Sequence, residues 1–268
     1  MIKKSKDVKI SLNWVTRKRP AELVYSVCSF VQNAIHPERL EIMFCIDDDD
    51  QDTDIAIRKI YPFLHVSKIK CIILKTKRLG YDHLDKYVRN AGKKFAGDCI
   101  ILATDDVFCM TNGWDEILAN SIKQHLDEPC LIQTQPVEDK YKFWPTMPGI
   151  TRKWWEITHN IMIYTAGDGY LDEITKELNL RRIRPNYEVH QLSRNAVAKR
   201  SKNWTEDDET QKEGRGNKSN ICVITGKKRR KHNEDDGIHT KARDVENLTK
   251  WKLGKDDYSW PKEDTYQQ

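Results

Sequence analysis

One stretch decides the fold of this chain: Gly97-Asp98-Cys99-Ile100-Ile101-Leu102-Ala103-Thr104-Asp105-Asp106-Val107-Phe108. It begins with a turn residue, continues through mostly apolar residues, and ends in the two carboxylates Asp105 and Asp106. A short continuous apolar run is typical of a strand that is buried on both faces. In open α/β sheets, ligands bind beyond the carboxyl ends of the strands. The stretch therefore predicts either a site for a cation or phosphate or an ordinary surface turn after a core strand.

A second strand in this chain ends in acids in the same way. Leu40 to Ile46 is a short apolar run, and Asp47-Asp48-Asp49-Asp50 follows it directly. Four consecutive acids repel one another unless they are solvated or paired with cationic or hydrogen-bonding groups. We expect the acids of the two strands to converge on one edge of the sheet.

The order of the remaining elements predicts the fold class. Apolar patterns typical of strands alternate with patterns typical of amphipathic helices, and the connections between them are short. This alternation predicts an α/β fold, with a mostly parallel open sheet covered by helices. We expect strands at 8–15, 40–46, 69–74, within 97–108 and at 130–134, and helices at 21–34, 55–64, 81–96 and 115–125.

The pattern changes after residue 135. We expect an irregular loop over 136–155, a strand over 156–164, a helix over 170–180 and an extended segment over 183–191, which together make a mixed C-terminal part. From about residue 195 the sequence is highly charged and has few apolar residues. We therefore expect a catalytic domain over 1–213 and a charged, poorly packed tail over 214–268, in which Ile221 to Ile224 could dock.

Composition narrows the class of protein. The 268 residues are 38% hydrophobic and 32% charged, with a net charge of +5 that is made of mixed signs. This mild charge is compatible with an anionic substrate and does not call for nucleic acid. The seven cysteines include no close pair at metal-ligand spacing, which favours buried thiols in a reducing compartment. We find no signal peptide and no apolar run long enough to span a bilayer, so we expect a cytoplasmic protein, and the sequence does not indicate membrane contact.

The residues quoted so far resemble the family 2 glycosyltransferases, whose nucleotide-sugar-binding fold is of the GT-A type. The resemblance spans roughly residues 8–210. The features that carry it are the loop Thr16-Arg17-Lys18-Arg19-Pro20 after the first strand, Asp47-Asp48 after the second, Asn90-Ala91-Gly92 before Gly97-Asp98, and Thr104-Asp105-Asp106 followed by Gly113-Trp114-Asp115. Thr104 stands where the family's Asp-x-Asp motif has its first acid, which leaves metal dependence open.

The resemblance implies an enzyme that moves a sugar from a nucleoside-diphosphate donor to the hydroxyl of a saccharide or other acceptor. A divalent cation, Mn²⁺ or Mg²⁺, would neutralise the leaving diphosphate as a Lewis acid. The metal would be held by Asp106 and His190, although His190 could equally be a hydrogen-bonded structural histidine. The expected nucleotide-sugar-binding residues are Thr16, Arg17, Asp47, Asp48, Lys77, Gly80, Asn90 and Asp105.

Asp168, between two glycines, is the expected catalytic base. Its alternative role is to cap the helix that follows, and Asp172 and Glu173 are nearby alternatives for the base. A single carboxylate base without a covalent intermediate would invert the anomeric configuration. Trp154 and Trp155 could stack on the acceptor or pack in the core, and the same holds for Trp144.

Three other functions are possible from the sequence. A nucleotidyltransferase could use the same sheet, but the loop 16–20 has no glycine for a phosphate-binding turn. A non-catalytic nucleotide-sugar-binding module would explain Thr104. A nucleic-acid-binding protein is suggested by the basic run 227–231, but acids follow that run and no aromatic residues interleave it.

Overall fold

The computed structural model describes residues 7–80, 83–136, 147–162, 167–191 and 231–259. Its main sheet has seven strands in the order β3-β2-β1-β4-β8-β6-β9. Within it, β8 runs antiparallel to both of its neighbours and the other pairs are parallel. The predicted α/β fold with a mostly parallel sheet is confirmed. The strands are β1 (Ile10–Val15), β2 (Leu40–Asp47), β3 (Lys70–Thr76), β4 (Cys99–Ala103), β6 (Leu131–Gln133), β8 (Pro148–Thr151) and β9 (Arg182–Ile183).

A smaller second sheet forms beside the end of β4. It has the order β5-β10-β7, from β5 (Val107–Cys109), β10 (Glu188–Gln191) and β7 (Gln135–Pro136). The pair β10 and β5 is antiparallel, with His190 opposite Phe108. This sheet brings the segment that carries His190 next to the strand that follows Asp106.

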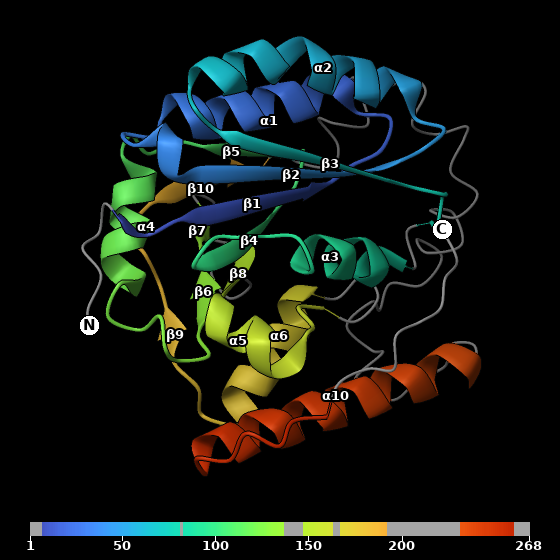
Figure 1. The fold of residues 1–268 in the computed structure, drawn as a ribbon, viewed down its shortest axis with the longest axis vertical. Coiled ribbons are helices and arrows are strands. Elements are labelled where there is room, and N and C mark those ends of the chain that lie inside the picture. The colour runs from blue at the N-terminus through green and yellow to red at the C-terminus, as the bar shows by residue number, and fades with distance from the viewer. Residues whose placement is uncertain (1–6, 81–82, 137–146, 163–166, 192–230, 260–268) are drawn as a thin grey trace.

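Helices cover both faces of the main sheet (Figure 1). On one face lie α1 (Pro20–Gln32) and α2 (Gln51–Val66), and on the other lie α3 (Leu84–Gly92), α5 (Arg152–Thr158) and α6 (Gly167–Glu177). Two separate hydrophobic clusters follow from this arrangement, one on each face. Along β1, Leu12 and Trp14 belong to the cluster under α1, whereas Ser11 and Asn13 are buried polar residues. The alternation of side chains along a strand produces this division.

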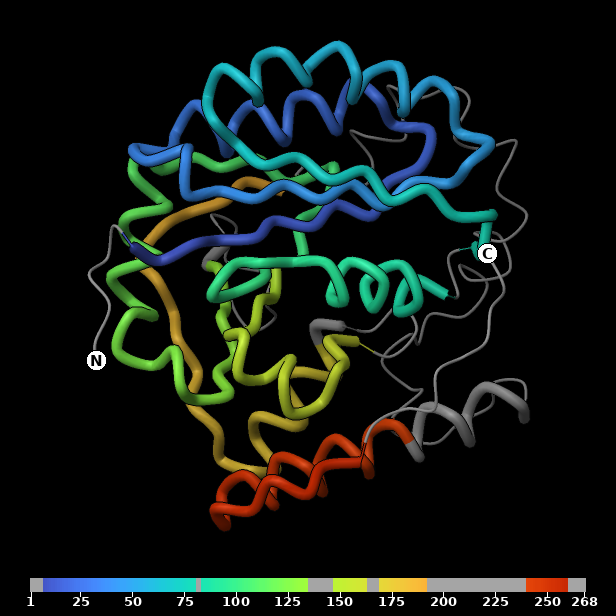
Figure 2. The backbone as a smooth tube through the Cα atoms, viewed as in Figure 1, coloured from blue at the N-terminus to red at the C-terminus, as the bar shows by residue number. Residues whose placement is uncertain are grey.

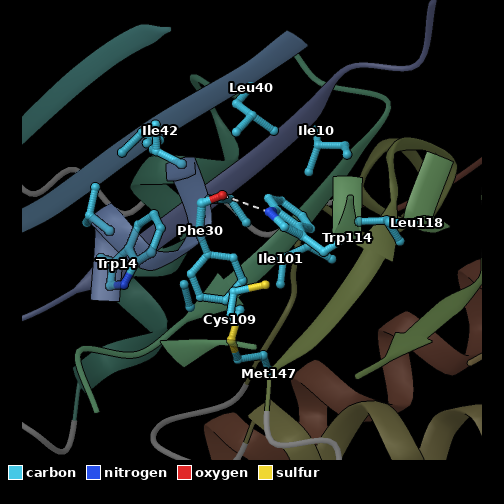
Figure 3. Packing of buried hydrophobic residues seen from close by; sticks show 14 of the residues in the cluster. Ile10, Trp14, Phe30, Leu40, Ile42, Ile101, Cys109, Trp114, Leu118 and Met147 are labelled. Atoms are coloured by element: carbon cyan, nitrogen blue, oxygen red, sulfur yellow. Dashed lines mark hydrogen bonds between the residues drawn. The ribbon is translucent and has the colours of Figure 1, made fainter. Parts of the chain in front are cut away.

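Aromatic rings join β1, α1 and α4 (Trp114–Ile122) in the first cluster (Figure 3). Phe30 meets Trp14 edge-to-face at 5.9 Å between ring centroids, and it meets Trp114 in the same way at 5.2 Å. The Trp114 indole N–H donates to the carbonyl of Phe30 at 2.7 Å. Edge-to-face pairs of this kind add stability beyond the area they bury. They fix the position of α4 relative to the sheet.

The Gly113-Trp114-Asp115 segment also has a structural role. Gly113 has a φ of 76°, and a Cβ there would lie 2.8 Å from Ile35. Asp115 is fully buried and accepts hydrogen bonds from the Arg39 guanidinium and from the backbone N–H of Ile35. This segment therefore anchors α4 to the turn that precedes β2.

Four sequence predictions differ from the structure. The helix expected over 55–64 begins at Gln51 and continues to Val66. The apolar run at 69–74 is typical of a buried strand, but β3 is partly exposed because it lies at the edge of the sheet. The irregular loop expected over 136–155 is wrong from residue 148 on, where β8 and the start of α5 lie, and the strand expected over 156–164 is wrong in its first part, where α5 occupies 152–158. Trp154, Trp155 and Thr158 are buried at helical spacing, and the apparent alternation was too short to distinguish the two structures.

The region expected to be a poorly packed tail contains a docked helix. α10 (Lys231–Lys252) contacts α5 and α6, and it lies beside them at the bottom of Figure 2. Leu248 is fully buried in the second cluster. The apolar segment 221–224 lies outside the described residues, and the boundary at 213/214 stays a prediction. Among the described helices, none is both long enough and apolar enough to span a membrane.

Candidate functional site

The predicted convergence of acids is present at one edge of the main sheet. β1 pairs in parallel with β2 on one side and with β4 on the other, so the three strands end together. The loop that leaves β1 bonds to both neighbours. Thr16 donates from its hydroxyl to Asp105 at 2.7 Å, and its backbone N–H donates to the Cys45 carbonyl at 3.2 Å. Arg17 reaches Asp47 at 2.7 Å. We call the edge formed by Thr16, Arg17, Asp47, Asp105 and Asp106 the acidic rim.

Asp105 is a buried acid of the acidic rim, at the end of β4. Its side chain is 8% exposed and forms an ion pair with Arg19 at 2.8 Å. Burial raises the pKa of the Asp105 carboxyl, while the charge of Arg19 and the hydrogen bond from Thr16 oppose that rise. Both oxygens are therefore bound within the protein. Asp105 holds the loop after β1 against the end of β4.

Asp47 lies on the other side of the β1 end and is also held on both oxygens. One oxygen accepts from Arg17, and the other accepts from the Tyr87 hydroxyl. The Tyr87 oxygen in turn accepts from the Leu79 backbone N–H at 2.8 Å. Burial and the neighbouring Asp47 raise the pKa of Tyr87 to about 12, so Tyr87 remains a hydrogen-bond donor. The loop after β3 is thus tied to the acidic rim through Tyr87.

The other acids of the run 47–50 have different roles. Asp50 is buried and caps α2, accepting from the Thr53 hydroxyl at 2.7 Å. Asp49 is exposed and forms a two-pronged pair with Arg17, at 2.5 and 2.9 Å. This hydrogen-bonded pair lowers the pKa of the Asp49 carboxyl. Asp48 is also exposed, and its backbone N–H donates to Thr76 at 2.8 Å. The repulsion within the run is relieved by pairing and by solvent.

Asp106 is half-buried, and Gln191, the residue after His190, lies beside it. Gln191 approaches a carboxylate oxygen of Asp106 at 3.5 Å, a weak contact. His190 is paired with Phe108, two positions beyond Asp106 along the chain. Among the described residues, no group of three or more His, Cys, Asp or Glu could hold a metal.

This donor set still fits one type of metal site. Mg²⁺ and related hard cations are usually bound by one or two carboxylates together with substrate phosphates and water. Asp106 offers one such carboxylate beyond the end of the parallel strand β4. Thr104, in the position of the motif's first acid, has a hydroxyl that finds no hydrogen-bond partner in the described part of the chain.

The residues expected around the diphosphate lie in two elements, the loop after β3 and helix α3. Lys77 is exposed in the loop after β3. Gly80, in the same loop, has a φ of 83°, a conformation that glycine adopts without strain. Asn90 lies in α3, about 9 Å along the helix axis from its first residue at 1.5 Å per residue. The structure thus ties the 77–80 loop to the acidic rim through Leu79 and Tyr87, and it places Asn90 in the same helix as Tyr87.

Asp168 lies in the first turn of α6, and its side chain is outside the described part of the structure. The two alternative bases are engaged elsewhere. Asp172 is 5% exposed and pairs with Arg182 at 2.5 Å and Lys176 at 2.6 Å. Glu173 pairs with Lys241 at 3.2 Å. These ion pairs make both residues poor candidates for a base that must reach a substrate.

The tryptophans expected either to stack on an acceptor or to pack in the core are core residues where the structure describes them. Trp154 is fully buried and Trp155 is 8% exposed. Trp155 packs edge-to-face on Phe95, and its ring fills the space where Gly92 has no side chain. The stacking role is therefore excluded for Trp154 and Trp155. Trp144 lies outside the described residues.

Sequence reasoning missed several residues of the acidic rim. Arg19 was part of the quoted loop but was assigned no role, and Tyr87, within the helix expected over 81–96, was assigned none either. Gln191 was not considered. A usable signal existed for Arg19, because a buried acid pair at a strand end requires a nearby cation. No local pattern could have identified Tyr87, which is 40 residues from its partner Asp47.

Comparison with known proteins identifies the fold. No family model matches the sequence, and no curated protein matches it. Among solved structures, the mannosyltransferase PcManGT from Pyrobaculum calidifontis, in complex with GDP-Man and Mn²⁺, is similar with a TM-score of 0.56. The match covers 90% of this chain and 73% of that one, at 14% sequence identity.

TarS of S. aureus is also similar. Its 1–349 fragment in complex with UDP matches with a TM-score of 0.52 and 15% identity, covering 68% of this chain and 60% of that one. The complex with UDP-GlcNAc gives a TM-score of 0.50 and 16% identity, covering 69% and 59%. This chain thus spans less than two thirds of these TarS chains. At such low identity the likeness shows the fold alone, an α/β fold that this chain shares with these glycosyltransferases.

Proposed function

We propose that this protein is a glycosyltransferase that moves a sugar from a nucleoside-diphosphate donor to an acceptor hydroxyl, with inversion at the anomeric carbon. The observation that carries the proposal is the acidic rim itself. Acids from β2 and β4 flank the end of β1, at the edge where open α/β sheets bind ligands. The solved structures that share the fold include complexes with GDP-Man, UDP and UDP-GlcNAc.

The proposed donor site uses the residues around the β1 end. Asp47 presents a carboxylate whose orientation is fixed by Arg17 and Tyr87, and this carboxylate accepts an N–H of the nucleoside base. Arg17 and Lys77 are the cations that meet the diphosphate. Asp48 remains a proposed contact to the nucleoside. Each carboxylate oxygen has more than one lone pair, so Asp47 can accept from the base without releasing its present partners.

Three further residues, Thr16, Gly80 and Asn90, are proposed to line the donor site. Asp105 acts from its buried position by holding Thr16 and Arg19 in place, on the side of the ribose or the diphosphate.

We assign the metal to Asp106, with His190 as a second ligand. A divalent cation there supplies Lewis-acid stabilisation of the leaving diphosphate. Asp168 accepts the proton of the acceptor hydroxyl from the first turn of α6. Its place in the first turn supports this role, because a helix N-terminus favours the charged form of a carboxylate.

Ligand-dependent thermal stability tests the donor and metal sites. A nucleoside diphosphate at about 100 times its Kd stabilises the folded state by about 2.7 kcal/mol. For a chain of this size, that free energy corresponds to roughly 5–10 °C in Tm. We expect one of UDP, GDP, CDP or dTDP to give such a shift, and we expect Mn²⁺ to increase it. The Asp106→Asn variant should lose the increase due to Mn²⁺ and keep a part of the shift due to the nucleotide.

Asp52→Asn is the matched control, because Asp52 is an exposed acid in the first turn of α2 and its loss changes the net charge equally. The proposal fails if no nucleoside diphosphate or nucleotide sugar shifts the Tm at any metal concentration. The metal assignment fails if Asp52→Asn loses as much of the Mn²⁺ response as Asp106→Asn does.

A non-catalytic nucleotide-sugar-binding module is the second candidate, and two observations favour it. Thr104 replaces an acid of the motif, and both oxygens of Asp105 are engaged by Thr16 and Arg19. The two candidates differ in turnover. We would incubate a panel of nucleotide sugars with the protein and Mn²⁺. A transferase should convert one of them and release free nucleoside diphosphate, whereas the module would bind a donor and leave it intact.

A further inference from the structure

α10 is attached to the rest of the protein through a buried polar network. Asp244 of α10 is fully buried, and one of its oxygens accepts from the Tyr170 hydroxyl and from the Asn160 amide, the latter at 3.0 Å. The Asn160 amide also lies 3.2 Å from the Tyr170 oxygen. The second oxygen of Asp244 accepts from Arg243 at 2.7 Å. Asp244 is thus held by its neighbour Arg243 on one oxygen and by two residues from distant parts of the chain on the other.

The two partners of Asp244 lie on either side of one short segment. Asn160 follows α5 directly, and Tyr170 lies in the first turn of α6. The residues between them include Asp168, the proposed base. His159 stacks on Trp155 and has a φ of 51°, in the left-handed region. This conformation turns the chain out of α5 immediately before Asn160. The network therefore holds both ends of the segment that carries Asp168.

Stability alone does not explain a carboxylate in this position. Burial raises the pKa of the Asp244 carboxyl against the opposing effects of Arg243, Tyr170 and Asn160, which means that the ionised form is costly there. A well-packed apolar contact between α10 and α6 would give equal or greater stability. Hydrogen bonds from fixed donors are directional, so they restrict the placement of α6 relative to α10 more than an apolar contact does.

We infer that Asp244 is a positioning residue for the proposed transfer reaction: through Tyr170 and Asn160 it fixes the first turn of α6 and with it the place of Asp168. This inference rests on the proposed function for its catalytic consequence. It assigns α10, in the charged C-terminal region, to the acceptor side of the enzyme. The donor residues of the acidic rim belong to other elements, so donor binding does not depend on Asp244.

The chain offers a matched control within α10. Asn247 is also fully buried, and its amide donates to the Ile157 carbonyl at 3.1 Å and to the Ser259 carbonyl at 2.5 Å. It docks α10 on α5 without touching Tyr170 or Asn160. Asn247→Ala should therefore destabilise the docking of α10 while leaving the Asp244 network in place.

The experiment compares Asp244→Ala, Asp244→Asn and Asn247→Ala at a temperature at which all three are folded. We expect Asp244→Ala to lower kcat by roughly 10- to 100-fold, the effect of a misplaced catalytic group, with KM for the donor unchanged. Asp244→Asn keeps one acceptor oxygen and should recover a part of the lost kcat. Asn247→Ala should lower Tm and leave kcat within about twofold of the wild-type value.

Hydrogen exchange of the α6 amides gives a second readout that needs no turnover. Asp244→Ala should accelerate exchange in the first turn of α6, and Asn247→Ala should not. Unchanged kcat in Asp244→Ala, or an equal loss in Asn247→Ala, overturns the positioning role. If the wild-type protein transfers no sugar from any donor, the proposed function fails, and faster exchange confined to Asp244→Ala would still establish the anchoring of α6. Equal exchange in the three proteins would overturn that as well.

Discussion

The ion pair between Arg19 and Asp105 gives the sharpest test of the acidic rim. Its side chains are 16% and 8% exposed, and their atoms are 2.8 Å apart. Removing one partner of a buried pair costs about 3–5 kcal/mol, because the remaining charge is buried without its partner. The Thr16 hydroxyl still donates to the other oxygen of Asp105 at 2.7 Å. We therefore expect Arg19→Met to lower the free energy of unfolding by about 3 kcal/mol at pH 8.

The size of this loss should depend on pH in a definite direction. Burial already raises the pKa of Asp105, and the loss of Arg19 raises it further. A carboxyl group whose pKa is higher in the folded than in the unfolded state contributes most favourably at low pH. Its contribution is lost as the pH rises through the folded-state pKa. The destabilisation should therefore shrink by up to ~1.4 kcal/mol per pH unit as the pH falls through that value.

Urea unfolding of the wild type and Arg19→Met between pH 5 and pH 8 measures the effect. Arg58→Met is the control, because Arg58 pairs with Asp54 at the surface, where its own side chain is 66% exposed. An exposed pair of this kind contributes about 0.3–0.5 kcal/mol. A loss below about 1 kcal/mol at pH 8 in Arg19→Met, or a loss that is the same at every pH, would refute the reasoning for Asp105.

Three further predictions concern packing and charge. Gly92→Ala should lower the free energy of unfolding by about 1–3 kcal/mol, because its Cβ would lie 2.2 Å from the Trp155 ring; equal urea midpoints would contradict this. Trp154→Ala should lower the free energy of unfolding by about 3–5 kcal/mol and leave donor binding to the folded variant intact. Loss of donor binding by the folded variant would reopen a binding role for Trp154. Asp49→Asn should lower stability by about 0–1 kcal/mol near neutral pH, because Arg17 lowers the Asp49 pKa. This difference in stability should vanish as the pH falls below 3.8, the ordinary pKa of the carboxyl, and high salt should also reduce it. Urea unfolding measures both effects.

Local sequence patterns were enough to predict much of the secondary structure and the sheet of this protein. Strand-forming runs that end in acids identified β2 and β4, and the alternation with helices identified the sheet as mostly parallel. These features are encoded over a few residues, since side chains repeat every second residue in a strand and at every third or fourth in a helix. The convergence at the acidic rim followed as well, because strands that run in parallel end at the same edge. The sequence alone was therefore enough to point to Asp47 and Asp105.

Only the tertiary structure decided which groups hold those acids. Arg19 is 86 residues from Asp105, and Tyr87 is 40 residues from Asp47, so the chain crossovers choose the partners. The same holds for α5, where burial of both Trp154 and Trp155 against α3 and the sheet outweighs a short alternating pattern. It holds most clearly for α10. Its composition is typical of a solvated tail, yet a few buried contacts around Asp244 and Leu248 attach it, because the fold provides partners that a linear pattern does not contain.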